Sequence, residues 1–335
     1  MPRRLTNLLL LALVLAQVAS GVLGWVLPEA RALPLYELHR GLGLALVVLL
    51  AWKQVIVRSS LRRRLGRSPW DRSVLVGAVT ALALLGSLGL GLAWTLNLVS
   101  FESLWGYSPL NLHVALGLAL VPLVLLHLAR RWERKPAAPD LVSRRSALRL
   151  IGLSAATLVS WRLVEQAAEA FAEGSRRASG SKHAGSFTGN DFPITIWLFD
   201  TVPALDVASW RLQVGGNVAR PGSFAYRELV ALPAREARAV LDCTGGWWSE
   251  QVWRGVAVGD LLAACDVAPH AREAAVVSVT GHRWSFPLDE LRSAVLATHV
   301  GDEELSPGHG YPLRLVVPGR RGFQWVKWVG RIEVA

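Results

Sequence analysis

Long apolar runs fill the first half of the chain and predict membrane-spanning helices. Four of them are each long enough to cross about 30 Å of hydrocarbon as an α-helix. They are Leu5–Leu27, Leu35–Val57, Ser73–Val99 and Leu110–Ala129. A fifth run, Leu150 to Trp161, has twelve uncharged residues, a length typical of the apolar region of an export signal. Because Arg149 and Arg162 can snorkel from its ends, it also predicts an anchor helix.

The pattern changes after about residue 190 to short β-like runs separated by turn residues. The candidate strands are Trp210–Val214, Ala275–Val279 and Leu313–Val317, and the candidate helices are Val258–Ala264 and Leu288–Ala297. The predicted fold is therefore an all-α membrane bundle of four spans plus a fifth signal or anchor helix, followed by an α+β, strand-rich domain. The predicted boundaries are 1–135 for the four-helix membrane domain, 136–172 for the fifth helix, 173–189 for a Ser/Gly-rich linker and 190–335 for the C-terminal domain.

The basic residues orient this arrangement. The net charge is +11, and the excess lies in two loops between apolar runs. These loops contain Arg58, Arg62, Arg63, Arg64, Arg67 and Arg72, and Arg130, Arg131, Arg134, Lys135, Arg144 and Arg145. The alternate loops have no basic excess, which is the positive-inside pattern. The charge thus indicates a lipid bilayer rather than nucleic acid as partner. With these loops inside, a fifth span places the C-terminal domain on the outer (periplasmic or extracellular) side of the cytoplasmic membrane.

A pair of arginines, Arg144 and Arg145, stands directly before the fifth apolar run. Twin arginines before an apolar segment are a signal for exporting folded proteins. The alternative is that they only add to the inside charge. Their place on the inner face, and a following run that is short for a span, favour the signal and predict the twin-arginine export machinery as a partner.

The membrane half contains an internal repeat. Residues 39–53 read HRGLGLALVVLLAWK and residues 113–127 read HVALGLALVPLVLLH, with eight of fifteen positions identical. The repeat places His39 and His113 at equal depth, each with a glycine one turn later on the same helix face (Gly43, Gly117). Histidines inside membranes are functional by default, and this pair predicts bis-histidine ligation of haem b. The alternative is two interfacial histidines hydrogen-bonded across the bundle.

A second matched pair is unequal, because His127 corresponds to Lys53. It predicts either a second haem with an unusual ligand set, or a structural role in which Lys53 snorkels to headgroups and His127 caps its helix. Both readings stay open.

Two strings in the C-terminal half are the candidates for a functional site. They are LDCTGGWWSEQVWRGVAVGDLL at 241–262 and HGYPLRLVVPGRRGFQWVKWVGRIEV at 309–334. Together they resemble the oxidoreductase molybdopterin-binding domain of the sulfite oxidase family, which includes periplasmic methionine sulfoxide reductases, over about residues 187–335. The resemblance implies a molybdenum–molybdopterin cofactor with Cys243 as the thiolate ligand of the metal. A soft thiolate suits such a metal. Cys265 reads as a buried structural cysteine.

The same resemblance implies a set of residues that contact the pterin. They are Asn190, Asp191, Phe192, Ser278, His309, Arg314, Trp325, Val326 and Lys327. Arginine and lysine suit the pterin phosphate, and main-chain N–H groups near Gly319–Gly322 are expected to form an anion nest.

One departure from the family concerns the substrate. Sulfite oxidases place arginines shortly after the ligand cysteine, whereas this chain has Trp247, Trp248, Ser249 and Glu250 there. An aromatic, acidic rim disfavours sulfite and suits a neutral small molecule such as a sulfoxide. We therefore expect Trp248 to act beside Cys243 at the catalytic centre.

The sequence is compatible with three candidate functions. The first is a membrane-bound molybdoenzyme whose haem b relays electrons to quinone or another membrane carrier, in either direction. The second keeps the molybdenum domain on a haemless anchor. The third is a non-catalytic, membrane-tethered binding module.

Overall fold

A computed structural model of the chain describes residues 3–65, 72–101, 107–130, 143–171, 174–196 and 200–335. The chain divides into two compact units, Met1–Gly180 and Ser181–Ala335. Four of the basic loop residues (Arg67, Arg131, Arg134 and Lys135) and the predicted boundary at 135/136 lie outside the described residues.

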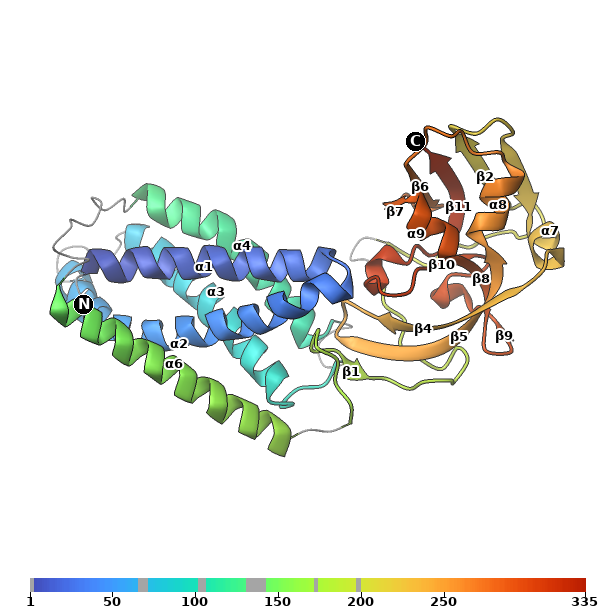
Figure 1. The fold of residues 1–335 in the computed structure, drawn as a ribbon. Helices are drawn as coiled ribbons and strands as arrows, with labels where there is room; N and C mark the ends of the chain where they lie inside the picture. Colours follow the sequence, from blue (N-terminus) through green and yellow to red (C-terminus); the bar gives the residue numbers. More distant parts are fainter. Residues whose placement is uncertain (1–2, 66–71, 102–106, 131–142, 172–173, 197–199) are drawn as a thin grey trace. The chain divides into compact units, whose positions relative to one another are not determined.

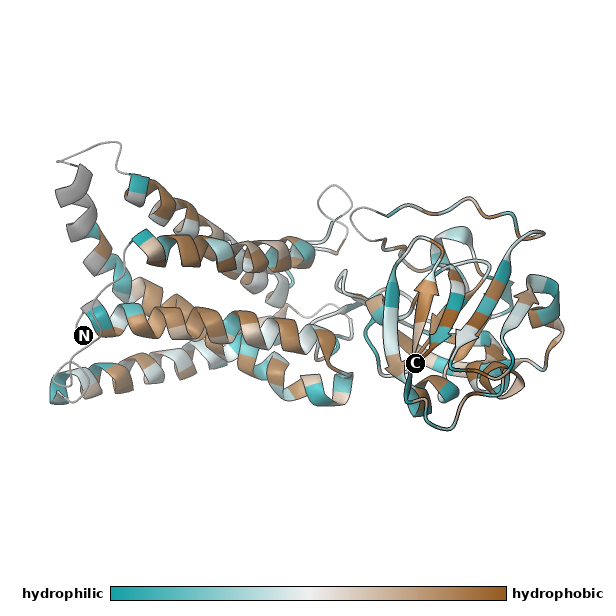
Figure 2. Ribbon diagram, turned by 90° about the horizontal axis from the view of Figure 1, so that it is seen from above, coloured by the Kyte–Doolittle hydropathy of each residue, from teal (hydrophilic) through white to brown (hydrophobic). Residues whose placement is uncertain are grey.

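Long helices form the N-terminal unit (Figure 1). They are α1 (Arg3–Val26), α2 (Glu29–Leu65), α3 (Arg72–Thr95), α4 (Pro109–Arg130) and α6 (Arg144–Ala170). All five are long and apolar enough to cross a membrane. Figure 2 shows apolar residues around these helices, and Leu82 and Leu158 are 70% and 69% exposed. Helices that are apolar all round are typical of membrane segments, so the unit is suited to a membrane.

The first four helices pair as two hairpins, α1 with α2 and α3 with α4, and α6 packs on α2. In the first hairpin the hydroxyl of Tyr36 donates to the carbonyl of Gly24 (2.7 Å). The pairing matches the two-helix repeat expected from the sequence. The short apolar run 150–161 lies within a 27-residue helix, because polar residues such as Arg162 and Glu165, an i,i+3 ion pair, continue the helix beyond it.

The chain after α6 folds back onto the N-terminal unit. The guanidinium of Arg176 donates to the carbonyls of Trp94 (2.7 Å) and Thr95 (2.8 Å) at the end of α3. The indole N–H of Trp94 donates to the carbonyl of Gly180 (2.9 Å). These contacts satisfy carbonyls that a helix C-terminus leaves unpaired, and they hold part of the predicted linker.

Two sheets form the C-terminal unit (Figure 1). The first has the order β1-β5-β8-β10, with β4 beside β5 and β9 beside β8; its strands are β1 (Lys182–His183), β4 (Arg235–Asp242), β5 (Trp247–Ala257), β8 (Val295–Val300), β9 (Glu303–Glu304) and β10 (Arg314–Val316). The second has the order β3-β2-β11-β6-β7; its strands are β2 (Arg211–Gly216), β3 (Gly222–Ala225), β6 (Glu273–Ser278), β7 (Arg283–Pro287) and β11 (Val329–Val334). Short helices α7 (Tyr226–Ala231), α8 (Val258–Ala264) and α9 (Leu288–Ser293) connect strands.

The predicted α+β character agrees with these elements, and α8 has the predicted bounds. The predicted helix over Leu288–Ala297 is wrong in its second half, because α9 ends at Ser293 and β8 begins at Val295. Val295, Leu296 and Ala297 are almost fully buried. A short apolar run does not by itself distinguish a helix end from a buried strand.

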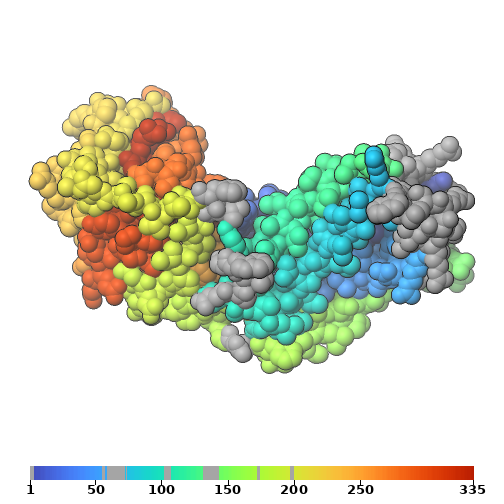
Figure 3. Space-filling model, turned by 180° about the vertical axis from the view of Figure 1, so that it is seen from behind, coloured from blue at the N-terminus to red at the C-terminus, as the bar shows by residue number. Residues whose placement is uncertain are grey.

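Alternation along the strands builds the core. In β2, Leu212 and Val214 are buried while Arg211 and Gln213 are exposed, as period-two geometry requires. The segment after Ser181, yellow-green in Figure 3, lies against the orange-red segments near the C-terminus. There the side-chain amide of Asn190 donates to the carboxylate of Glu303 (2.9 Å).

Candidate functional site

The cysteine predicted to bind the metal lies in a tight turn between β4 and β5. Cys243 follows the last residue of β4 and is 7% exposed. Its backbone N–H donates to the carbonyl of Trp247 (2.9 Å), and Gly246 donates back to the carbonyl of Cys243 (3.0 Å). The N–H of Gly245 points to the cysteine Sγ (3.3 Å). The turn therefore places the sulfur beside a main-chain donor.

Three basic side chains from the second predicted string lie close to one another near this cysteine. Arg314 and His309 are each 2% exposed. Arg314 donates to the carbonyl of His309 (2.9 Å) and lies over the rings of Trp253 and Trp325. The ammonium of Lys327 donates to the carbonyls of Thr195 (3.0 Å) and Gly308 (2.6 Å). All the hydrogen bonds described for the two cations go to backbone carbonyls, which are uncharged.

Burial lowers the pKa of each of these groups. The pKa of Lys327 falls to about 7, because of desolvation and then the charge of Arg314, while the thiolate charge of Cys243 raises it. Desolvation lowers the pKa of Arg314 to about 10, and Cys243 again acts in the opposite direction. The pKa of His309 falls to about 4, through desolvation and the two neighbouring cations. The site therefore favours an anion, whose charge would restore the proton on Lys327.

His309 is oriented rather than left free for a metal. Its Nε2 lies 3.0 Å from the carbonyl of Phe192 and its Nδ1 lies 2.8 Å from the hydroxyl of Ser306. Because a carbonyl only accepts, Nε2 carries the proton and Nδ1 accepts from Ser306. The ring also packs on the ring of Phe192, with centroids 4.0 Å apart.

The residues present fit a molybdopterin with its phosphate. The Nε of Arg314 and the indole N–H of Trp325 are buried without a hydrogen-bond partner among the described residues. Buried donors of this kind are costly unless a ligand satisfies them. The Nε of Arg321 is likewise buried without a partner among the described residues, but the charge of this guanidinium is balanced by the carboxylate of Asp242, 2.6 Å away. Arg314 and Lys327 are therefore the candidates for contacting the phosphate, and the role of Cys243 as the thiolate ligand of the metal stays a prediction.

The structure gathers most of the other predicted contacts around this cluster. Phe192, Trp325 and Val326 are buried. The side chain of Asn190 accepts from the N–H of Ser306 (2.9 Å), so it fixes the loop that carries His309. Asp191 is exposed. Ser278 lies on β6, and its hydroxyl pairs with Thr280, which donates to Asp200 (2.9 Å); its pterin contact stays a prediction.

The side chains of Trp247 and Trp248, which follow the cysteine turn on β5, point to opposite faces of the strand. The indole N–H of Trp247 donates to the hydroxyl of Thr195 (3.0 Å), and Trp247 packs near Phe192. Trp248, the next residue of β5, packs on exposed His183 with the two rings tilted and their centroids 4.6 Å apart. Since neighbouring residues of a strand face opposite sides, Trp247 faces the predicted pterin residues. A catalytic role of Trp248 stays a prediction.

Sequence reasoning missed Thr195 at this site and named Trp247 only as part of the substrate rim. Thr195 and Trp247 converge with the Cys243 thiol around Gly245, where an added Cβ would lie 3.2 Å from the Thr195 hydroxyl and 3.5 Å from the cysteine Sγ. The glycine of the Cys-x-Gly motif was the available signal for this crowding. Thr195 had no signal, because its position depends on the chain folding back.

The helical unit brings His39 of α2 and His113 of α4 together. Their ring centroids lie 5.9 Å apart and the rings are nearly perpendicular. The Nδ1 of His39 lies 3.0 Å from the carbonyl of Gln17, and the Nδ1 of His113 lies 2.7 Å from the carbonyl of Ser87. Both rings therefore carry the proton on Nδ1, and the lone pair of Nε2 is the one that could bind a metal.

The surroundings of the two histidines repeat as well. A Cβ on Gly21 of α1 would lie 3.0 Å from the His39 ring, and one on Gly91 of α3 would lie 3.1 Å from the His113 ring. At metal–nitrogen distances of about 2 Å, two imidazoles on opposite sides of one metal have centroids roughly 6 Å apart. The observed spacing of 5.9 Å is close to this value, and ligation of a shared haem iron stays a prediction. The side-chain amide of Gln17 occupies the Nε2 of His39 (3.0 Å) and would have to turn away.

Lys53 and His127, the second matched pair, lie in different surroundings. Lys53 donates to the side-chain oxygen of Asn7 on α1. His127 faces Gly77 of α3, where an added Cβ would lie 3.4 Å from its ring. The contact of His127 with a glycine resembles those of His39 and His113.

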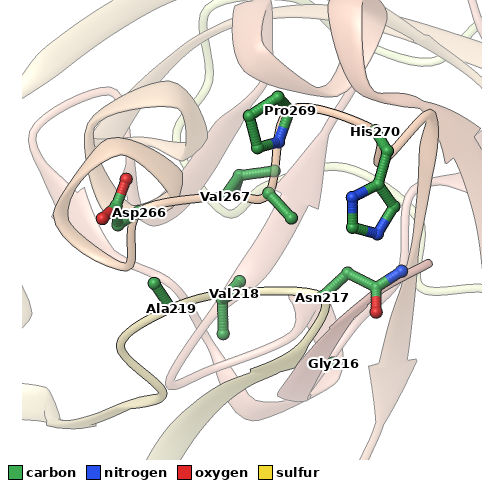
Figure 4. Close-up of a pocket in the computed structure, with 9 residues that line it drawn as sticks. Gly216, Asn217, Val218, Ala219, Asp266, Val267, Pro269 and His270 are labelled. Carbon is green, nitrogen blue, oxygen red and sulfur yellow. The ribbon is translucent and has the colours of Figure 1, made fainter.

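A surface hollow of about 410 Å³ lies elsewhere in the C-terminal unit. Figure 4 shows it between the segments 216–219 and 266–270, with His270 pointing toward Asn217. None of the predicted site residues lines it.

Comparison with known proteins finds a match for the C-terminal unit. Residues 199–335 match the oxidoreductase molybdopterin binding domain. The chain is 29% identical over 171 residues to nitrate reductase [NADH] of Brassica napus and 33% identical over 168 residues to nitrate reductase [NAD(P)H] of Hordeum vulgare; each match covers 40% of this chain and 19% of the relative. The chain thus spans about a fifth of the length of these relatives. The sulfane dehydrogenase SoxCD of Paracoccus pantotrophus is 28% identical, with 40% of each chain covered and a TM-score of 0.38.

Proposed function

We propose that this chain, which carries a molybdopterin-binding oxidoreductase domain at residues 199–335, is a membrane-anchored molybdenum enzyme. It performs two-electron, oxygen-atom-transfer chemistry on a small substrate outside the cytoplasm. The observation that supports this best is the pair of cations near Cys243, buried Arg314 and half-buried Lys327, with backbone carbonyls as their described hydrogen-bond partners. Cations withdrawn from water in this way need an anion, and a pterin phosphate supplies one.

Each residue has a defined task in this proposal. Cys243 supplies the thiolate ligand, and the bound cofactor supplies the oxo and redox chemistry. Arg314 and Lys327 hold the phosphate. Neutral His309 keeps the loop that follows Ser306 in place. Trp247 and Thr195 close the site beside Gly245 and exclude water from it.

The proposed substrate is neutral, such as a sulfoxide. The relatives are nitrate reductases by name, and nitrate, like sulfite, is an anion. Trp247 and Trp248 stand where sulfite oxidases have arginines. The carboxylate of Glu250, also on β5, pairs with Arg238 of the neighbouring strand β4 (2.6 Å). Such a rim offers aromatic surface instead of free positive charge.

The proposed route for electrons runs through haem b between His39 and His113 to quinone or another membrane carrier. It rests on the facing rings, the two Nδ1–carbonyl contacts and the two glycines. His127 opposite Gly77 is the place for a second haem. The proposed topology, with inside basic loops and the domain exported through Arg144–Arg145, rests on the charge pattern.

The experiment is a turnover assay of the purified full-length chain in both directions. Oxidation of a reduced dye by sulfoxides and reduction of a dye by sulfite are followed, with Cys243→Ser as control. We expect sulfoxide turnover that the substitution abolishes, and sulfite turnover at least tenfold weaker. Efficient sulfite turnover contradicts the proposed rim, and equal turnover by Cys243→Ser contradicts the proposed enzyme.

A second candidate keeps the molybdenum domain on a haemless anchor. The Gln17 amide at the Nε2 of His39 favours it, since this contact already satisfies the ring. A reduced-minus-oxidised spectrum of purified membranes decides, because a haemless anchor shows no b-type band.

A further inference from the structure

The ligand cysteine is flanked by a buried ion pair. Asp242, the residue before it, is 5% exposed, and its carboxylate lies 2.6 Å from the guanidinium of Arg321, also 5% exposed. Ser181, fully buried, donates its hydroxyl to the same carboxylate oxygen (2.6 Å). The pair thus joins three segments that are far apart in the sequence.

The pair ties the cysteine turn to the turn expected to hold the phosphate. Asp242 and Arg321 are also bridged through their backbones, and the guanidinium of Arg321 reaches the carbonyl of Cys243 (3.4 Å). A Cβ on Gly322 would lie 3.2 Å from the Cys243 Cα, so the two turns are in close contact. On the other side, the N–H of Lys182 donates to the carbonyl of Gly246 (2.9 Å), at the end of the cysteine turn.

A buried ion pair is weak evidence for stability, because desolvation of two charges offsets their attraction. Its best-attested role is to fix the register of the segments that it joins. It also places two opposite charges next to the metal ligand, in surroundings where charges are poorly screened. Removing either partner leaves the other charge unbalanced beside the cysteine.

We infer that Asp242 and Arg321 form a positioning latch that holds the Cys243 turn against the 318–324 turn and sets the reduction potential of the metal. The inference rests on the proposed molybdenum function. Neutralising Asp242 leaves a positive charge that favours the reduced metal and raises its potential. Neutralising Arg321 leaves a negative charge that lowers it.

The test is a redox titration of the Mo(V) electron paramagnetic resonance signal in the full-length holoprotein. We expect D242N to shift the one-electron equilibrium at least tenfold toward the reduced metal and R321Q to shift it at least tenfold toward the oxidised metal, about 59 mV each way. The double variant D242N/R321Q returns close to the wild-type value. A merely structural role does not give opposite shifts that cancel.

The adjacent arginine provides a matched control. Arg320 pairs with Glu290 of α9 at 2.5 Å, in the same turn but away from the cysteine. E290Q removes a neighbouring ion pair, and we expect it to leave the potential unchanged. A shift with E290Q as large as that with D242N would overturn the latch.

A second measurement covers variants that retain too little metal to titrate. R321K keeps the positive charge but loses the planar guanidinium, whose nitrogens contact both the Asp242 carboxylate and the Cys243 carbonyl. We expect a near wild-type potential and metal release at least threefold faster. Single variants that keep molybdenum and shift in the same direction, or not at all, overturn the latch, as does R321K that releases metal at the wild-type rate. A wild-type chain without molybdenum instead overturns the proposed function.

Discussion

Arg314 donates from Nη1 to the carbonyl of His309, 2.9 Å away, while its Nε has no hydrogen-bond partner among the described residues. The first contact fixes the guanidinium, and the second atom is left for a ligand. Since a buried unsatisfied donor costs about 1–3 kcal/mol, this arrangement is disfavoured unless something fills the site. The geometry of this one side chain is the basis for assigning it to the pterin phosphate.

We predict that Arg314→Gln reduces the pterin content at least tenfold while the chain still folds. The glutamine retains a polar side chain but cannot bind the phosphate as a cation. Pterin fluorescence after extraction measures the effect. Arg331→Gln is the control, because Arg331 is 56% exposed on β11. Equal pterin content in the wild-type chain and Arg314→Gln would remove Arg314 from the binding site.

The cofactor-free chain is predicted to become more stable as pH rises. The pKa of Lys327 is lowered to about 7 from 10.5, and that of His309 to about 4 from 6.5. Between each pair of values the unfolded chain binds more protons, so the free energy of unfolding rises with pH there. We therefore expect the free energy of unfolding to rise from pH 4 to 6.5 because of His309, and to rise again from about pH 7 because of Lys327.

Thermal unfolding of full-length chain from cells without molybdopterin synthesis, followed by tryptophan fluorescence, measures both rises. Lys327→Met should remove the rise above pH 7 and leave the lower one, because methionine has a similar length and no charge. Bound cofactor should also reduce the increase in stability above pH 7, because the phosphate keeps Lys327 protonated. A stability that falls between pH 7 and 9 is the opposite result.

If His39 and His113 share one haem, replacing either histidine should remove that haem completely. His39→Ala and His113→Ala should each abolish the b-type band of the haem that they share, since a low-spin bis-histidine iron needs both ligands. His127→Ala should leave this band and remove only a second haem. His183→Ala, in an exposed strand of the other unit, is the control. A wild-type band that survives both His39→Ala and His113→Ala would place the haem elsewhere.

Export is predicted to need arginine itself rather than positive charge. Arg144 and Arg145 begin α6, whose N-cap is Ser143 with its hydroxyl accepting from Ser146 (3.2 Å). Replacing both with lysine keeps the helix and the inside charge but removes the twin-arginine signal. Protease treatment of intact cells should then no longer cleave the C-terminal unit. Unchanged cleavage would mean that the fifth helix inserts conventionally.

The sequence predicted the features that depend on local pattern. Apolar length predicted the long helices, and the two quoted strings predicted the molybdopterin-binding domain, which the family match confirms. The bounds of α8 were correct because the spacing of its buried apolar residues, Val258, Leu261 and Leu262, is a local pattern. The number of spans stays a prediction.

Features that depend on distant segments could not be predicted. Thr195, Ser181 and the Asp242–Arg321 pair meet only when the chain folds back. The two-residue strand β1 has no period to detect, so Lys182 and His183 were placed in a linker. Trp248 was grouped with Trp247 by proximity in sequence, although strand alternation directs the two side chains differently.

The most direct test is molybdenum and pterin analysis together with a reduced-minus-oxidised spectrum of one preparation, compared between wild type and Cys243→Ser. The account predicts about one molybdenum atom per chain in the wild type, since one thiolate holds one metal. Cys243→Ser should lose at least nine-tenths of the metal while Cys265→Ser retains it, with the b-type band the same in all three. Molybdenum well below one atom per chain, unaffected by Cys243→Ser, would contradict the account.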